Sequence, residues 1–149
     1  MTAQASDLTS IVHAIELAVA PVFLVSGVSG MLAVLTHRLS RIIDRARLLE
    51  AALVSPLAND EMLAELKALT HRAKLINRAI SLATTCALMI CAAITVLFLG
   101  AFAGFDASIL VGIVFMVALI ALMGSLFSFL REVQVAIRSM RIGVRQRIP

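Results

Sequence analysis

Tryptophan and tyrosine are absent from the sequence, and only 15% of its 149 residues are charged. This absence excludes the usual aromatic belt at a lipid–water boundary, where only phenylalanine is left to take that place. No aromatic platform and no nucleic-acid module accompany the basic residues, so we expect no nucleic acid partner.

Cysteine and histidine are scarce, with two and three residues respectively. Cys86 and Cys91 lie five positions apart in an apolar run and would face different sides of a helix, which disfavours an intrachain disulfide. His37 and His71 lack both the i, i+4 spacing of a zinc-binding helix and a third ligand. We therefore expect no metal and no cofactor.

Catalytic motifs are missing as well. The sequence contains no glycine-rich phosphate loop, no serine nucleophile elbow and no group of carboxylates within an apolar run. A length of 149 residues allows one compact domain and leaves no room for a separate catalytic domain. We expect no catalytic residues and no enzymatic activity.

Apolar side chains are abundant, at 61% of the residues against about 45–50% in soluble domains. They are concentrated in three runs without Asp, Glu, Lys or Arg, at residues 17–36, 79–102 and 107–130. Twenty helical residues rise about 30 Å, which is the thickness of the hydrocarbon core of a bilayer. The sequence therefore predicts an all-α polytopic membrane protein, a single integral domain over residues 1–149 with three transmembrane helices.

Charge is distributed unevenly around the apolar runs. Segment 37–78 contains eight Lys/Arg and five Asp/Glu, and segment 131–149 contains five Arg and one Glu. Residues 1–16 contain two acidic residues and no Lys or Arg, and the link between the second and third runs contains only Asp106. Because basic residues collect on the cytoplasmic side of membrane proteins, both basic segments are predicted to be cytoplasmic, with the N-terminus outside and the C-terminus inside.

Both cytoplasmic segments contain helical seams of apolar residues. Two seams with spacings of 4, 3, 4, 3 and 4 lie on either side of Pro56 and predict an antiparallel helical hairpin over 37–78. A third seam predicts that the tail 131–149 is an amphipathic helix. The first seam is Leu35, Leu39, Ile42, Ala46, Leu49 and Leu53, the second is Met62, Leu66, Leu69, Ala73, Ile76 and Ile80, and the third is Val133, Ile137, Met140, Val144 and Ile148.

Small residues within the apolar runs predict close helix packing. Gly27 and Gly30 lie in the middle of the first run, and Ala83 and Ala87 belong to a row at four-residue spacing in the second. Small side chains allow helix backbones to approach closely in a membrane. We expect these four residues to pack helices together and the chain to form a homo-oligomer, while Pro21 should kink the first helix or end a short outer segment.

Four blocks of the sequence resemble a known family. They are A-P-V-F-L at 20–24, L-T-H-R-L-S-R-I-I-D-R-A-R at 35–47, R-A-K-L-I-N-R-A-I at 72–80 and F-L-R-E-V at 129–133. Together they resemble the bacterial membrane-protein family catalogued as domain of unknown function 2721, over roughly residues 8–143. The resemblance implies a small integral protein of the bacterial cytoplasmic (inner) membrane, and it implies no established activity and no functional residues.

Polar residues in the first run and directly before it form one candidate site. Glu16, Ser26 and Ser29 are placed to line a cation path if several chains surround an axis. The alternatives remain open: Glu16 suits a helix-end charge in the headgroup region beside His13, and serines in membrane helices often hydrogen-bond to their own backbone.

Basic residues at the cytoplasmic edge form a second candidate site, for anionic lipid headgroups. The alternative is that these charges set the topology and form salt bridges within the hairpin, for example between Arg41 and Asp44. The candidate headgroup residues are Arg38, Arg41, Arg45, Arg78 and Arg131.

Two functions are consistent with these features. The first is a homo-oligomeric assembly that forms a small cation conduit at a subunit interface, because three spans are few for a transporter that acts alone. The second is a non-conducting scaffold or accessory subunit. Its hairpin and tail would bind membrane lipids or a membrane or cytoplasmic protein partner.

Overall fold

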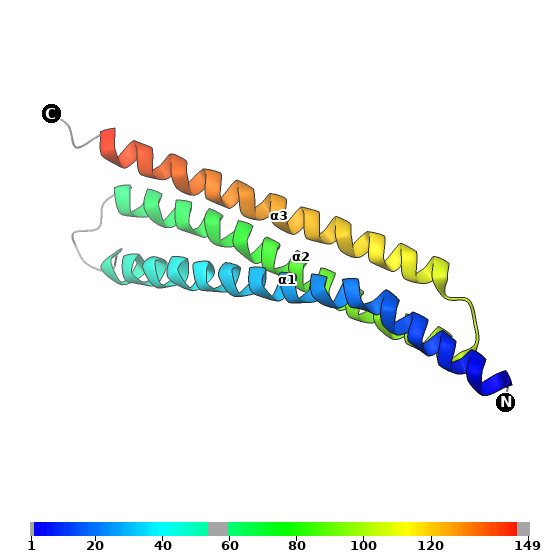
Figure 1. Cartoon of the computed structure of the whole chain (residues 1–149). Helices are drawn as coiled ribbons and strands as arrows, with labels where there is room; N and C mark the ends of the chain where they lie inside the picture. The colour runs from blue at the N-terminus through cyan, green and yellow to red at the C-terminus, as the bar shows by residue number, and fades with distance from the viewer. Residues whose placement is uncertain (1, 54–59, 146–149) are drawn as a thin grey trace. The chain divides into compact units, whose positions relative to one another are not determined.

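The computed structural model describes the backbone of residues 2–53 and 60–145, and the side chains of residues 12–13, 15–53 and 60–137. Three helices account for nearly all of this chain: α1 (Thr2–Leu53), α2 (Asp60–Ala103) and α3 (Ser108–Arg145) (Figure 1). The described residues contain no strand, which confirms the all-α class.

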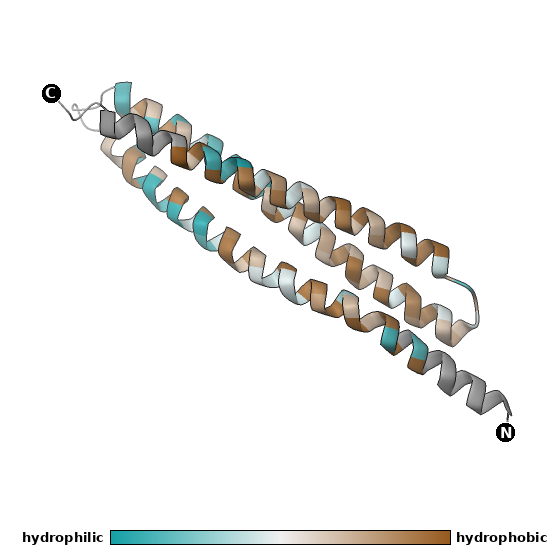
Figure 2. Ribbon diagram, turned by 45° about the horizontal axis from the view of Figure 1, so that its top comes forward, coloured by the Kyte–Doolittle hydropathy of each residue, from teal (hydrophilic) through white to brown (hydrophobic). Residues whose placement is uncertain are grey.

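Each helix contains a stretch that is long and apolar enough to cross a membrane. Many large apolar side chains on these stretches are exposed, including Phe23 at 74%, Leu88 at 67% and Ile109 at 80%. Removing apolar surface from water is favourable by about 25 cal/mol per Å². These exposed side chains are therefore more stable in contact with hydrocarbon than with water. Figure 2 shows the apolar residues gathered along the later part of α2 and the earlier part of α3. The prediction of three helices able to span a membrane is confirmed.

Pro21 lies inside α1, and the helix continues on both sides of it. Of the two predictions for Pro21, an end of the helix is therefore not observed. A proline within a membrane helix is tolerated where side chains or neighbouring helices satisfy the freed carbonyl group. The predicted break around Pro56 lies outside the described residues.

The described chain divides into two compact units. Unit 1 consists of the described residues of Met1–Leu32 and Leu82–Met123. Its core is an apolar cluster to which all three helices contribute, and each of these side chains is at most 2% exposed. The cluster consists of Val28, Ala83, Cys86, Ile90 and Ala118.

The row of small residues on α2 is buried over only part of its length. Ala83 is fully buried and Ala87 is half-buried, whereas Cys91, four residues further on, is exposed. An α-helix has about 3.6 residues per turn. Residues spaced strictly four apart therefore rotate gradually around the helix and do not stay on one contact face. The buried positions instead alternate between spacings of three and four and pass through Cys86 and Ile90.

Unit 2 consists of the described residues of Ala33–Ser81 and Gly124–Pro149. The first two seams line its core, and all twelve of their side chains are buried or half-buried. The side chains of both seams thus lie on inward faces of α1 and α2 within unit 2. Ser125, also fully buried, donates a hydrogen bond of 2.7 Å to the carbonyl oxygen of Ala79. The buried apolar side chains of the seams are Leu35, Ile42, Leu49, Leu69 and Ile76.

The buried face of α3 differs from the predicted third seam. Ser125, Ser128 and Glu132 are the buried side chains in this part of the helix, whereas Ile137 is 51% exposed. Val133 is only half-buried. The described part of the third seam is thus not the face of α3 that is buried in the single chain, because Ser125 and Glu132, which have polar partners in unit 2, occupy the inward positions. The side chains from Met140 onward lie outside the described residues.

Gly104 ends α2 with a left-handed backbone, at φ 69°. Its N–H and that of Phe105 both donate to the carbonyl oxygen of Gly100, at 2.9 and 3.3 Å, and the second of these bonds is typical of a Schellman cap. An L-residue in this conformation costs about 1–2 kcal/mol. This geometry closes the helix within one residue and turns the chain toward α3.

Replacing Gly104 with alanine is expected to destabilise the protein by about 1 kcal/mol, because alanine resists the positive φ. The matched control is Gly112→Ala in α3, where an added Cβ meets no atom within 4 Å and the backbone is helical. Thermal unfolding in detergent micelles, followed by circular dichroism, measures both variants. Equal midpoints for the two would contradict the cap assigned to Gly104.

Asp106 begins the third helix. Its carboxylate Oδ1 accepts hydrogen bonds from the backbone N–H and the hydroxyl of Ser108, the first residue of α3. The hydroxyl bond, and then the backbone bond, lower the pKa of Asp106 below its ordinary value. The charged carboxylate also favours the positive end of the helix.

The lowered pKa of Asp106 in the folded protein makes the free energy of unfolding depend on pH. The charged form of Asp106 stabilises the fold above the ordinary pKa of an aspartate, and this contribution is lost as the pH falls through the lowered value. Asp106→Asn is therefore expected to lower the unfolding midpoint at pH 7, and the difference should shrink toward pH 3. A constant difference across parallel melts at both pH values would show that Asp106 contributes no charge-dependent cap.

Candidate functional site

Glu132 is the centre of the candidate site. Its side chain is fully buried, although it comes from a position just beyond the third apolar run. An isolated carboxylate in such surroundings would be strongly unfavourable, so a buried glutamate requires compensating charge and hydrogen bonds. The structure provides both from the two other helices of unit 2.

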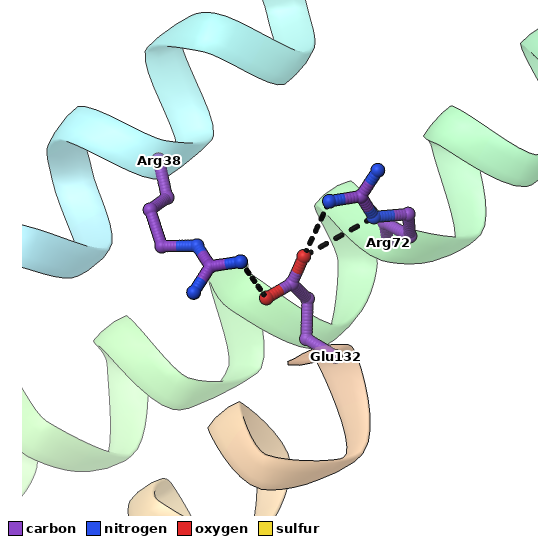
Figure 3. Close-up of polar contacts among 3 residues, drawn as sticks. All are labelled: Arg38, Arg72 and Glu132. Atoms are coloured by element: carbon purple, nitrogen blue, oxygen red, sulfur yellow. Dashed lines mark hydrogen bonds and ion pairs between the residues drawn. The ribbon is translucent and has the colours of Figure 1, made fainter. Parts of the chain in front are cut away.

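Arg72 of α2 holds one carboxylate oxygen of Glu132. Its Nε and Nη2 both donate to Oε1, at 3.1 and 2.8 Å. Arg38 of α1 approaches the other oxygen, with Nη2 3.2 Å from Oε2. This second contact is an ion pair without hydrogen-bond geometry, since Oε2 has no hydrogen-bond partner. Figure 3 shows Glu132 between the two guanidinium groups, which approach it from different helices.

The Arg38 side chain makes a second contact, with Phe129. Its guanidinium carbon lies 5.3 Å from the centre of the Phe129 ring, a cation–π distance. We call Arg38, Arg72 and Glu132 the ionic layer. It joins all three helices within unit 2 and carries a net charge of +1.

A basic groove lies beside the ionic layer, on α1 and α2. It encloses about 500 Å³ and is open on one side. Arg45, at its far end, forms a salt bridge with Glu65, with Nη2 2.9 Å from Oε1. Arg41 makes no ion pair with any side chain of the described chain. The groove is lined by Arg38, Arg41, Ile42, Arg45, Leu69 and Arg72.

The arrangement offers positive charge and hydrogen-bond donors. Four arginines face one groove, and the forked guanidinium group suits the paired oxygens of a phosphate or carboxylate. Among the residues that the structure describes, no group of three or more His, Cys, Asp or Glu could hold a metal ion. The four arginines of the lining suit the binding of an anion.

The profile of one protein family, described as "protein of unknown function (DUF2721)", matches residues 18–142. The chain belongs to this family. Comparison with curated proteins finds no match, and neither does comparison with solved structures. The stretch matched to DUF2721 contains the whole ionic layer and the whole basic groove, whereas Glu16 precedes it.

Three of the predicted headgroup residues of this DUF2721 protein come together, and two do not. Arg38, Arg41 and Arg45 line the groove. Arg78 and Arg131 are exposed and do not line it.

The predicted polar and packing residues in the first run and directly before it are exposed on the surface of the single chain. Glu16 and His13 face each other at 3.8 Å and are both largely exposed. Ser29 donates a hydrogen bond to the carbonyl oxygen of Val25, four residues earlier in its own helix. The other exposed residues are Ser26, Gly27 and Gly30, and an added Cβ at either glycine would meet no atom within 4 Å.

Sequence reasoning missed Glu132, the residue that organises the site, and the pairing of Glu132 with Arg72. A signal was present: Glu132 is the only acidic residue of segment 131–149, directly after an apolar run and among five arginines. It also lies seven residues after Ser125, which lies seven after Ala118, so these three share one face of α3. That spacing predicts a glutamate on the buried face of α3 if polar as well as apolar residues are allowed on that face.

Proposed function

We propose that the protein is a non-conducting scaffold of the bacterial cytoplasmic membrane. In this proposal the N-terminus is outside and the C-terminus inside, with the antiparallel hairpin 37–78 and the amphipathic tail 131–149 in the cytoplasm. The ionic layer carries the proposal, because one buried carboxylate joins the basic extensions of all three helices. Extensions held together in this way form a rigid platform that presents one fixed basic surface to a partner.

The core of unit 1 supports a non-conducting role. Side chains from all three helices fill it, and its buried members are all apolar or cysteine. An ion that crossed such a core would lose its hydration without finding polar ligands, at a cost of many kcal/mol. Conduction would therefore need a path between several chains. The buried members are Val28, Ala83, Cys86, Ile90 and Ala118.

One observation favours a second candidate, a homo-oligomer with a cation conduit at its axis. The polar and small residues of α1 are exposed, and the space beside Gly27 and Gly30 is open. A second copy of α1 could approach there closely and bring Ser26 and Ser29 to a shared axis. This candidate predicts that Gly27→Leu and Gly30→Leu reduce oligomer size in native mass spectrometry, while Ala92→Leu, an exposed site on α2, does not.

Topology labelling tests the placement on which the scaffold depends. We expect a membrane-impermeant maleimide to label Glu50→Cys only in inverted vesicles and Asp106→Cys only in right-side-out vesicles. Both positions are exposed, so an unlabelled cysteine reports its side of the membrane rather than burial. Labelling of Glu50→Cys from outside the cell would overturn the proposal.

Ion flux separates the scaffold from the conduit. The purified chain, reconstituted into liposomes, is expected to give no K⁺ or Na⁺ flux above that of empty liposomes at either sign of voltage. A flux that Glu16→Gln abolishes, and that Glu61→Gln at an exposed position of α2 leaves unchanged, would establish the conduit and refute the scaffold.

A further inference from the structure

The basic groove has more positive charge than the chain itself neutralises. Arg38, Arg41, Arg45 and Arg72 supply four positive charges to its lining. Glu132 and Glu65 are the only carboxylates in salt bridges with them among the described residues. The net charge of the groove is therefore about +2, and its open side gives access to an anion that is not part of the chain.

The position of the groove along α1 points to the lipid headgroup zone. Arg38 is the second residue after the uncharged run that ends at Thr36, and Arg45 lies seven residues further along the same helix. Seven residues rise about 10 Å, whereas the headgroup zone of one leaflet is about 5–8 Å thick. A helix that leaves the hydrocarbon near Thr36 thus holds Arg38 and Arg41 at the depth of the lipid phosphates.

The ionic layer prepares the groove for a ligand. Glu132 and Phe129 fix the Arg38 side chain, and Glu132 also fixes Arg72, so little side-chain entropy is left for a ligand to remove. Arg41 has its guanidinium donors free of ion pairs within the described chain. Ile42 and Leu69 are both buried and form the apolar floor of the groove between the arginines.

We propose that this groove binds the phosphodiester headgroup of an anionic phospholipid of the inner leaflet. A phosphodiester presents two oxygens to a guanidinium fork, and its attached acyl chains lie in the hydrocarbon next to Thr36. Inorganic phosphate shares the charge but lacks that apolar anchor. The inference uses the proposed function for one point, the cytoplasmic side of unit 2.

Lipid titration with matched variants tests the site. In native mass spectrometry of the full chain in detergent, added phosphatidylglycerol is expected to bind at least tenfold more tightly than phosphatidylcholine. The double variant Arg41→Gln, Arg45→Gln should weaken phosphatidylglycerol binding at least about fivefold, which is the loss expected for Arg41 alone, because Arg45 is paired with Glu65 and lies beyond the headgroup zone. Neither residue belongs to the ionic layer, so the fold should persist, and the unfolding midpoint of each variant verifies this.

The control is the double variant Arg47→Gln, Lys67→Gln. It removes the same two charges from exposed positions of α1 and α2 outside the groove. We expect it to change the affinity less than threefold. Equal weakening by the two double variants would overturn the site, because only the general surface charge would then attract the lipid.

A second arm separates lipid from soluble phosphate. Inorganic phosphate at 10 mM is expected to leave phosphatidylglycerol binding unchanged, and full competition would overturn the assignment to lipid. Failure of this inference is distinct from failure of the proposed function. If Glu50→Cys is labelled only from inside while lipid selectivity is absent, the scaffold stands without its lipid site.

Discussion

Replacing Glu132 with glutamine is expected to destabilise the folded protein by about 3–5 kcal/mol. The change keeps the shape of the side chain but removes the charge that holds Arg38 and Arg72. Breaking a buried ion pair by removing one partner leaves uncompensated charge, and losses of that size are typical. Unfolding by a denaturant in detergent micelles, followed by circular dichroism, measures the change in free energy.

The matched control is Glu50→Gln, which removes an equal charge from an exposed position on α1. We expect this variant to lie within about 0.5 kcal/mol of the unmodified protein. If Glu132→Gln and Glu50→Gln unfold at the same denaturant concentration, the ionic layer does not stabilise the packing of the three helices in unit 2.

A triple replacement separates charge from packing. Arg38→Met, Arg72→Met and Glu132→Leu together exchange the ionic layer for an apolar one of similar volume. Apolar replacement of a buried ion cluster is often neutral or stabilising, and in this layer Glu132 is fully buried while the side chains of Arg72 and Arg38 are 20% and 34% exposed. We therefore expect the triple variant to recover most of the stability that Glu132→Gln loses. A triple variant less stable than Glu132→Gln would show that the layer contributes net stability.

The second large effect is expected from Ala83→Leu. Ala83 is fully buried where all three helices meet in the core of unit 1, and three added carbon atoms have no space there. Overpacking of this kind costs about 1–3 kcal/mol, and more where backbones must separate. Ala92→Leu is the control, since Ala92 is exposed on the same helix and its leucine would face the membrane.

Unfolding in micelles again distinguishes the two alanines. We expect Ala83→Leu to lower the unfolding free energy and Ala92→Leu to leave it nearly unchanged. If both variants lose the same amount, the effect comes from contacts outside the single chain. The prediction of close packing at Ala83 within unit 1 would then be wrong.

The three apolar helices could be predicted because one strong physical rule governs them. Hydrocarbon excludes charge and unpaired backbone groups, so an uncharged run of twenty residues or more has few alternatives to a helix. The two seams could be predicted from the sequence equally well. Their buried side chains are Leu35, Ile42, Leu49, Leu69 and Ile76. Heptad spacing in a polar background reports directly which face is buried.

The ionic layer could not be predicted in the same way. Hydropathy assigns Glu132 to the surface, and only its neighbours in space make burial tolerable. Arg72 is sixty residues away in sequence, so no local pattern links the two. Because Val133 and Ile137 are apolar, their spacing places the third seam on their face of α3, whereas the buried face contains Ser125, Ser128 and Glu132. For Gly27 and Gly30 the pattern indicates close packing, but no described residue of a neighbouring helix lies within 4 Å of a Cβ added at either glycine.

The ionic layer also determines how far α3 can slide. A seam of heptads repeats itself, so apolar contacts alone would tolerate a displacement of α3 by seven residues. Such a displacement would bring the Glu132 carboxylate to the position of Ser125, against the carbonyl oxygen of Ala79, in a run that contains no arginine. The unpaired charge there would cost several kcal/mol. Glu132 therefore specifies one register of α3 against the other two helices of unit 2, among registers that apolar contacts alone would not distinguish.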